Sequence, residues 1–154
     1  MKFSSKEDIE APIEDVFEML FDFEGFERAA MRRGAEVQRV DGKPIGLVGM
    51  AWNASFKMRG KRRQAEIELV SIDRPNEMAF EGRTQGLVTH MGIELIALSK
   101  NRTRMMVVFE IKPLNLSARL LVQSLKLAKT SLTKKYKLRV AEFSKTLEDR
   151  YNRV

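Results

Sequence analysis

The chain has 154 residues, a formal net charge of +7, one histidine and no cysteine. The lack of cysteine excludes disulfides and thiolate metal sites, and a single histidine, His90, excludes a metal site that needs two. With 44% hydrophobic and 32% charged residues, the composition is typical of one globular domain, which we expect to cover residues 1–154. We find no apolar run long enough to cross a membrane and no signal-peptide pattern, so we expect a cytoplasmic protein without a metal or cofactor.

The positive charge is concentrated near the C-terminus. From Ser117 onward the chain has ten Lys and Arg residues but only three Asp and Glu residues. The rest of the chain has eighteen cationic and eighteen anionic residues. A basic chain suggests nucleic acid as a partner, but the cations are not interleaved with aromatic residues and no nucleic-acid-binding motif is present, so we expect no nucleic-acid partner. A solvated basic face is one interpretation, and a docking surface for an anionic membrane or an acidic protein is the other.

The first elements are a strand and two short helices. Residues 2–10 alternate in the manner of a strand, which ends at Ala11-Pro12. Pro12 suits the first turn of a helix because its missing N–H has no partner there. A second short helix is predicted from residue 23 to about 33, with Asp22 as its N-cap and Gly34 at its end.

Residues 35–113 change to a period of two, which is typical of antiparallel strands with one apolar face and one solvated face. Apolar and polar residues alternate over 50–58, 64–69, 87–97 and 104–112, and shorter strands are predicted over 35–40 and 77–81. Turn residues separate these segments, including a predicted turn from Gly82 to Gly86. The sequence therefore predicts an α+β fold with a seven-stranded curved antiparallel sheet.

The C-terminal segment predicts a long amphipathic helix, capped by Asn115 or Ser117. It contains no glycine or proline after residue 117, and its apolar residues are spaced by three or four from Leu121 to Leu147. At ~1.5 Å per residue such a helix would extend over about 55 Å, more than the width of a domain of this size. Three alternatives stay open: the helix projects beyond the sheet, it kinks near residues 130–133, or it packs against a second subunit.

The order of elements resembles that of the START-like superfamily, also called SRPBCC. The resemblance begins with a strand and Ile9-Glu10-Ala11-Pro12 leading into a short helix, and it continues through the further strands to the long terminal helix. It implies a helix-grip fold, in which the last helix lies across a curved sheet over a cavity. Members of the superfamily include lipid carriers, quinone chaperones and polyketide cyclases, so the fold by itself does not select a function.

The face of the sheet that would contact this helix is apolar and rich in methionine. Polar groups on it are few: Ser5, Glu7, Thr89, the indole N–H of Trp52 and the hydroxyl of Tyr136. The predicted ligand-binding cavity is lined by Trp52, Phe56, Met58, Ile67, Leu69, Phe80, Met91, Ile93, Met105, Val107, Phe109, Leu125, Leu132 and Tyr136.

Only two side chains are candidates for acid–base catalysis on this face. Glu7 is either a buried carboxylate with a raised pKa or a solvated residue near a strand end, paired with a neighbouring cation. Tyr136 is either a catalytic hydroxyl or a core residue bonded to a strand carbonyl. His90 is predicted to be a surface residue on the outer face, and a catalytic role would require it to lie on the opposite face.

This inventory favours binding over catalysis. The first hypothesis is a non-enzymatic carrier or sensor for a small hydrophobic ligand such as a lipid, quinone or polyketide-like compound. The second is a polyketide cyclase/dehydratase-like enzyme that uses Glu7 or Tyr136. The third is an interaction protein whose basic C-terminal helix contacts a partner, a membrane surface or a second copy, so that the chain is a monomer or a homodimer.

Overall fold

The structure is a computed structural model that describes residues 1–44 and 46–153. Seven strands form one antiparallel sheet in the order β1-β7-β6-β5-β4-β3-β2. This arrangement confirms the predicted fold class. The elements, in chain order, are β1 Lys2–Ile9, α1 Ile13–Met19, α2 Phe23–Arg32, β2 Glu36–Arg39, β3 Ala51–Met58, β4 Lys61–Asp73, β5 Glu77–Thr84, β6 Leu87–Ser99, β7 Arg102–Pro113, α3 Leu116–Leu127 and α4 Lys129–Asn152.

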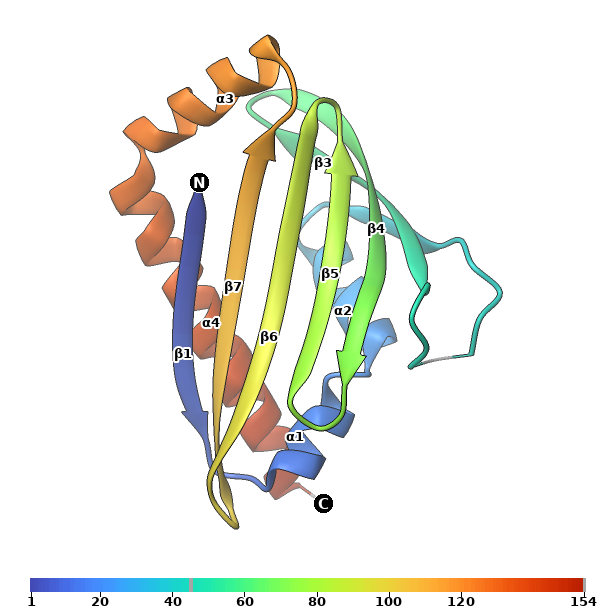
Figure 1. Cartoon of the computed structure of the whole chain (residues 1–154), viewed down its shortest axis with the longest axis vertical. Helices are drawn as coiled ribbons and strands as arrows, with labels where there is room; N and C mark the ends of the chain where they lie inside the picture. The colour runs from blue at the N-terminus through green and yellow to red at the C-terminus, as the bar shows by residue number, and fades with distance from the viewer. Residues whose placement is uncertain (45, 154) are drawn as a thin grey trace.

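The molecule has two layers. Helices α1, α2 and α4 lie on one face of the curved sheet, and α3 lies at one end of it (Figure 1). The opposite face of the sheet carries exposed polar residues such as His90 and Glu94, as the period of two predicts. A ligand-binding cavity would therefore lie between the sheet and the helices.

Caps and turns fix where the helices begin. The Asp22 carboxylate accepts a hydrogen bond from the Gly25 backbone N–H at 3.2 Å, and so caps α2 as predicted. Of the two predicted caps for the next helix, the structure selects Asn115, whose side chain accepts a hydrogen bond from the Ala118 N–H at 2.8 Å.

Two separate hydrophobic clusters hold the layers together. The larger one joins α1, the sheet and α4, and it includes the fully buried Ile9, Phe17, Leu20 and Leu147. The smaller one lies under α3, where Ala118 and Val122 pack with Leu87 of β6. The C-terminal segment therefore contributes to two cores.

This division requires the C-terminal helix to bend. The predicted continuous helix is interrupted at Ala128 (φ −104°, ψ 17°), two residues before the predicted weak cluster at 130–133. The break has a packing cause, because α3 covers the end of β6 and β7 while α4 runs across the face of the sheet beside β1. The kink, rather than an overhang, accommodates the length of the segment.

The turn between β5 and β6 is shorter than predicted. β5 continues to Thr84, so Gly82 is a strand residue paired with Thr89, and only Gln85-Gly86 make the turn. A Cβ atom at position 82 would collide with the hydroxyl of Thr89. A side chain at position 82 would require Thr89 to change its rotamer, so this glycine belongs to the strand and not to the predicted turn.

Candidate ligand-binding cavity

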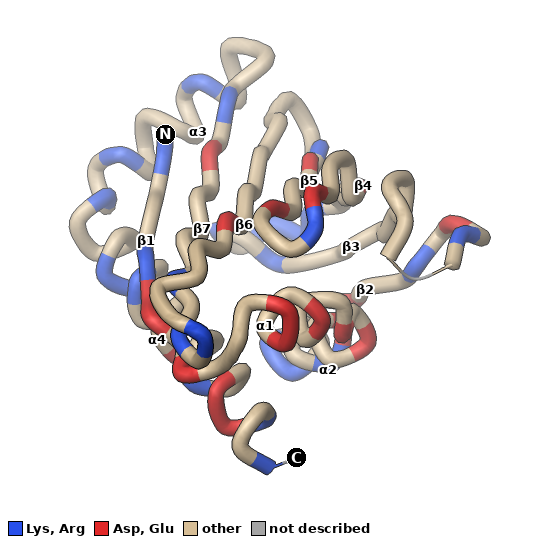
Figure 2. The backbone as a smooth tube through the Cα atoms, turned by 60° about the horizontal axis from the view of Figure 1, so that its bottom comes forward, with Lys and Arg blue, Asp and Glu red and all other residues tan. Residues whose placement is uncertain are grey.

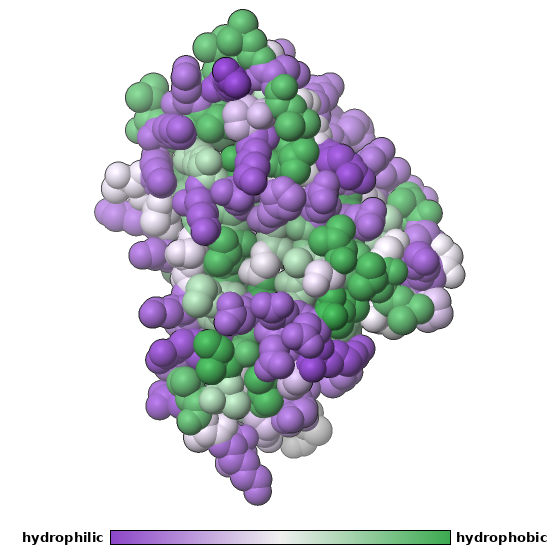
Figure 3. Space-filling view, viewed as in Figure 1, coloured by the Kyte–Doolittle hydropathy of each residue, from purple (hydrophilic) through white to green (hydrophobic). Residues whose placement is uncertain are grey.

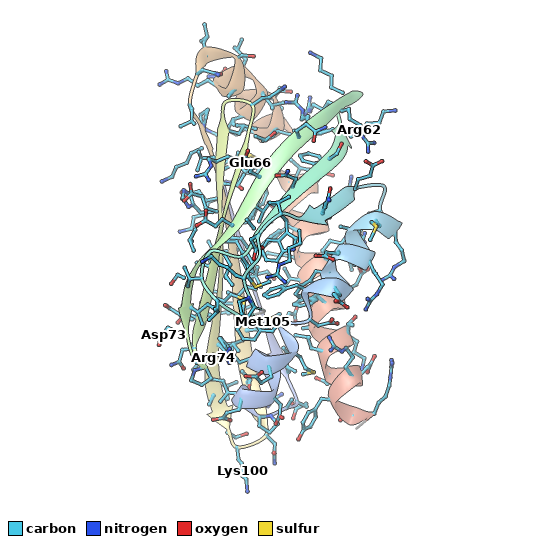
Figure 4. All side chains as sticks on the ribbon, turned by 90° about the vertical axis from the view of Figure 1, so that its right-hand side faces the viewer. Arg62, Glu66, Asp73, Arg74, Lys100 and Met105 are labelled. Atoms are coloured by element: carbon cyan, nitrogen blue, oxygen red, sulfur yellow. The ribbon has the colours of Figure 1, made fainter. Side chains whose placement is uncertain are left out.

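A cavity of about 510 Å³ lies between the sheet, α2 and α4. This volume is in the range of sites for small organic ligands. The side view shows side chains between the strands and the helices, and Met105 lies in this layer (Figure 4). The cavity is lined by Leu20, Phe23, Phe26, Glu27, Ala30, Val37, Trp52, Ile67, Met78, Phe80, Gly82, Thr89, Met91, Ile93, Val107, Phe109, Tyr136, Arg139, Val140 and Phe143.

Aromatic rings form one wall. The Trp52 ring lies 5.3 Å from that of Phe23 in an edge-on arrangement and 6.2 Å from that of Phe80. Phe23 comes from α2, and the other two rings come from neighbouring parts of the sheet. Such packed rings present rigid, flat apolar surface at small conformational cost.

The indole of Trp52 is fixed by a residue of α2. Its Nε1–H donates a hydrogen bond to the Glu27 carboxylate at 2.9 Å. Trp52 is only 5% exposed, so the bond satisfies a donor that folding removes from water. Glu27 thereby brings a carboxylate to a largely apolar cavity, whose lining also includes the cationic Arg139.

The hydroxyl of Tyr136 is engaged by the sheet. It donates a hydrogen bond to the backbone carbonyl of Val107 at 2.6 Å, which is the structural alternative predicted for this residue. Burial raises the pKa of Tyr136 to about 12, because desolvation disfavours the phenolate. At neutral pH the hydroxyl is therefore protonated, and it donates this proton in the hydrogen bond to the Val107 carbonyl.

Thr89 contributes a different kind of polar group. Its side chain lines the cavity beside Gly82 of the neighbouring strand. A hydroxyl can both donate and accept. Thr89 can thus bond a polar atom of a ligand from the floor of the cavity.

Residues in and next to α2 contact α4 beside the cavity. The rings of Phe26 and Phe143 lie 5.3 Å apart, one from each helix. Two ion pairs also join this part of the chain to α4, one between Asp22 and Arg150 at 3.3 Å and one between Arg33 and Glu142 at 4.0 Å. Access to the cavity is therefore bounded by α2 as well as by the C-terminal helix.

Eight of the fourteen residues predicted from the sequence line the cavity: Trp52, Ile67, Phe80, Met91, Ile93, Val107, Phe109 and Tyr136. Leu69 and Met105 are instead fully buried in the larger core. The other four lie half-buried outside the cavity lining, Phe56 and Met58 on β3 and Leu125 and Leu132 on either side of the helix break.

The remaining candidates lie elsewhere. Glu7 faces the α4 side of β1, half-buried and paired in register with Met105, but it does not line the cavity. His90 is exposed on the outer face, as predicted. Sequence reasoning missed Glu27, since a glutamate in a short polar helix carries no distinguishing signal. In the part of the chain that the structure describes, no cluster of His, Asp and Glu residues could hold a metal ion.

No protein-family model and no curated protein sequence matches the chain. Solved structures match over nearly its whole length. The aromatase/cyclase Zhui from Streptomyces sp. R1128 has a TM-score of 0.66 at 13% identity and covers 98% of this chain and 95% of its own. A protein from Thermus thermophilus has a TM-score of 0.66 at 14% identity, covering 96% and 97%.

A third similar structure is a point mutant of Thalictrum flavum norcoclaurine synthase in complex with a transition-state analogue. It has a TM-score of 0.65 at 11% identity and covers 98% of this chain and 96% of its own. Identities this low bear on the fold and not on the activity. Together with the sheet order and the position of α4, they show that the chain has a helix-grip fold.

Proposed function

We propose that the cavity binds a small, largely hydrophobic ligand that contains a flat ring system. The observation that carries the proposal is an apolar cavity of about 510 Å³ with one wall of packed aromatic rings. Few polar groups converge on it, and Thr89 offers a hydroxyl that can bond one polar substituent of the ligand. The ligand class that fits is an aromatic, quinone or polyketide-like compound.

The similar structures support this proposal. One is an aromatase/cyclase, and another is a norcoclaurine synthase in complex with a transition-state analogue. Both share the arrangement of sheet and helices described above. From these two proteins we infer only that a cavity in this fold can bind a small molecule.

Carriage is favoured over catalysis by the state of the titratable groups. The alternative, a cyclase/dehydratase-like enzyme, needs an acid or base within hydrogen-bond reach of the ligand. Tyr136 lines the cavity, but its proton is bonded to Val107 and its pKa is raised to about 12, which makes it a poor base at neutral pH. Glu7 lies outside the cavity lining, and the Glu27 carboxylate, which does line it, accepts the hydrogen bond of the Trp52 indole.

Binding can be tested with a variant whose larger side chain fills part of the cavity. Ala30 of α2 lines the cavity, whereas its neighbour Ala29 does not, so Ala30→Trp and Ala29→Trp form a matched pair. Titration with the fluorescent apolar probe ANS should show saturable binding to wild type and to Ala29→Trp, and binding at least about tenfold weaker to Ala30→Trp, because the added indole occupies the site. Equal ANS binding by all three proteins would falsify the proposal.

The natural ligand is accessible by native mass spectrometry of the chain purified from its own host. A retained small molecule that disappears in Ala30→Trp but not in Ala29→Trp identifies the occupant. Tyr136→Phe then separates the two candidate functions. A carrier keeps its ligand unchanged in this variant, whereas a cyclase-like enzyme that used Tyr136 would accumulate unreacted substrate.

A further inference from the structure

Helix α3 has apolar residues on both of its faces. One face packs Ala118 and Val122 onto the end of the sheet. The opposite face carries three leucines, which are 73%, 59% and 92% exposed; we call them the α3 leucine stripe: Leu116, Leu120 and Leu127. Their spacing of four and seven residues places them on one side of the helix. Exposed leucines in a row, unlike scattered ones, point to a surface that contacts a partner.

The stripe lies in the longest stretch of the chain without an acidic residue. Residues 111–141 contain eight Lys and Arg residues and no Asp or Glu. Arg119 and Lys126 flank the stripe on α3 itself, and Lys129 follows at the start of α4; all three are exposed. Figure 2 shows Lys and Arg positions along α3 and α4.

A second basic segment meets α3 at the same end of the molecule. The hairpin between β3 and β4 turns at Arg59-Gly60, and the Arg59 guanidinium donates a hydrogen bond to the Ser124 hydroxyl at 2.6 Å. Residues 57–63 of this hairpin hold five Lys and Arg residues and no acid. Arg62 lies at this end of the molecule (Figure 4), where it also forms an ion pair with Glu36 at 3.2 Å.

The outer surface agrees with this arrangement. Hydrophobic side chains gather over the α3 end and are bordered by hydrophilic ones (Figure 3). None of the described helices is both long and apolar enough to cross a bilayer, so contact with lipid would be made at the surface. A helix that lies in the interface combines an apolar stripe with flanking Lys and Arg residues, which is the composition of α3.

We propose that the α3 leucine stripe and the cations around it dock the protein onto an anionic lipid bilayer. The leucines enter the boundary between headgroups and acyl chains, and the cations of α3 and of the β3–β4 hairpin contact acidic headgroups. Charge complementarity selects this partner over a second copy of the chain. A two-fold interface through α3 would place two acid-free, basic helices against each other.

The test uses the full chain and vesicles of phosphatidylcholine, with or without phosphatidylglycerol. In flotation we expect binding to the vesicles that contain phosphatidylglycerol, little binding to phosphatidylcholine alone, and a loss of binding as salt is raised. Leu120→Trp should add blue-shifted emission only with the anionic vesicles, as the new indole leaves water. The native Trp52 is buried and contributes a constant background.

Replacement of Leu116, Leu120 and Leu127 together by serine should weaken vesicle binding at least about tenfold, because the apolar contact is lost. A matched control replaces three exposed apolar residues of the outer sheet face, Val70, Ile96 and Leu98, by serine and should bind as wild type does. Replacement of Arg119, Lys126 and Lys129 by glutamine should cost about fivefold per cation.

Three outcomes would overturn the proposal. They are equal binding to neutral and anionic vesicles, unchanged binding of the triple serine variant, and a dimer in sedimentation experiments that Leu127→Asp dissociates, which would make a second copy the occupant of the stripe. None of the substituted residues lines the cavity, so ANS binding should be the same in every variant. Failure of docking is thus distinguishable from failure of the proposed ligand binding.

Discussion

At the scale of single residues, the cavity wall depends on a hydrogen bond between α2 and β3. Glu27 and Trp52 are 25 residues apart in the chain, and their bond holds the indole edge-on to Phe23. The Glu27 carboxylate thereby supports the aromatic wall. Its loss should be visible both in stability and in the environment of the only tryptophan.

Glu27→Ala leaves the indole N–H without its partner and should lower the free energy of unfolding by about 1 kcal/mol. Urea unfolding followed by tryptophan fluorescence measures the change. Glu24→Ala, at an exposed position of the same helix, should stay within about 0.5 kcal/mol of wild type. Equal losses in the two variants would mean that the bond contributes nothing beyond helix propensity.

The raised pKa of Tyr136 predicts how the free energy of unfolding changes at alkaline pH. Its pKa is about 12 in the folded protein and 10.0 in its ordinary state, so the unfolded chain loses this proton first as pH rises. The stability that the neutral phenol contributes is therefore complete below pH 10 and is lost as pH rises towards 12.

Tyr136→Phe should accordingly flatten the fall in unfolding free energy between pH 10 and pH 12. It should also cost about 1 kcal/mol at neutral pH, through loss of the bond to Val107. Tyr151→Phe is the matched control, because it removes a phenol from the same helix. A wild-type slope that survives in Tyr136→Phe but not in Tyr151→Phe would contradict the assignment.

At the scale of elements, the break at Ala128 separates α3 from α4 energetically as well as in direction. α3 rests on the small cluster around Leu87, whereas α4 is part of the larger core through Leu147. Elements held by few buried contacts open locally at a lower free energy than the whole protein does. α3 should therefore open without loss of the cavity.

Val122→Ala, in the small cluster, should speed hydrogen exchange in α3 by about tenfold or more and leave α4 and ANS binding unchanged, because a buried truncation costs about 1–2 kcal/mol locally. Leu120→Ala, at an exposed position of the same helix, should leave exchange unchanged. Equal acceleration across α3 and α4 would show that the two helices form one cooperative unit.

At the scale of the whole molecule, one core joins α1, the sheet and α4. Leu147 is fully buried in it, while Leu138 of the same helix is 57% exposed. Leu147→Ala should lower the free energy of unfolding by about 2–5 kcal/mol and shift a single cooperative transition, whereas Leu138→Ala should change it by less than about 0.5 kcal/mol. Calorimetry distinguishes a shifted single transition from the loss of one part of the structure.

The period of two was enough to predict the sheet and its inner face, since burial of one face constrains every second residue. It could not separate residues that line a cavity from residues that are packed. Leu69 and Met105 share the face of Ile67 and Val107, but they belong to the fully packed core beneath α1 and α4. Which part of a face stays uncovered depends on where the helices lie, and alternation carries no information about that.

The helices show the same limit. The apolar spacing from Leu121 to Leu147 includes Val140 and Phe143, but it does not predict that Phe26 and Glu27 of α2 would line the same cavity. Length alone showed that one straight helix would exceed the width of the domain. The place of the break depends on the tertiary contacts of Leu87 with Ala118 and Val122, far apart in sequence.

The acid-free run at residues 111–141 also determines whether a change in pH can alter the charge of the α3 end. Carboxylates and histidines are the side chains that change charge between about pH 4 and pH 7, and this segment has neither. Acidification of its surroundings would therefore leave the charge of this surface unchanged. If the surface is regulated, the cues that remain are ionic strength, the acidic lipid content of the bilayer, or a covalent change at its serines, threonines and lysines.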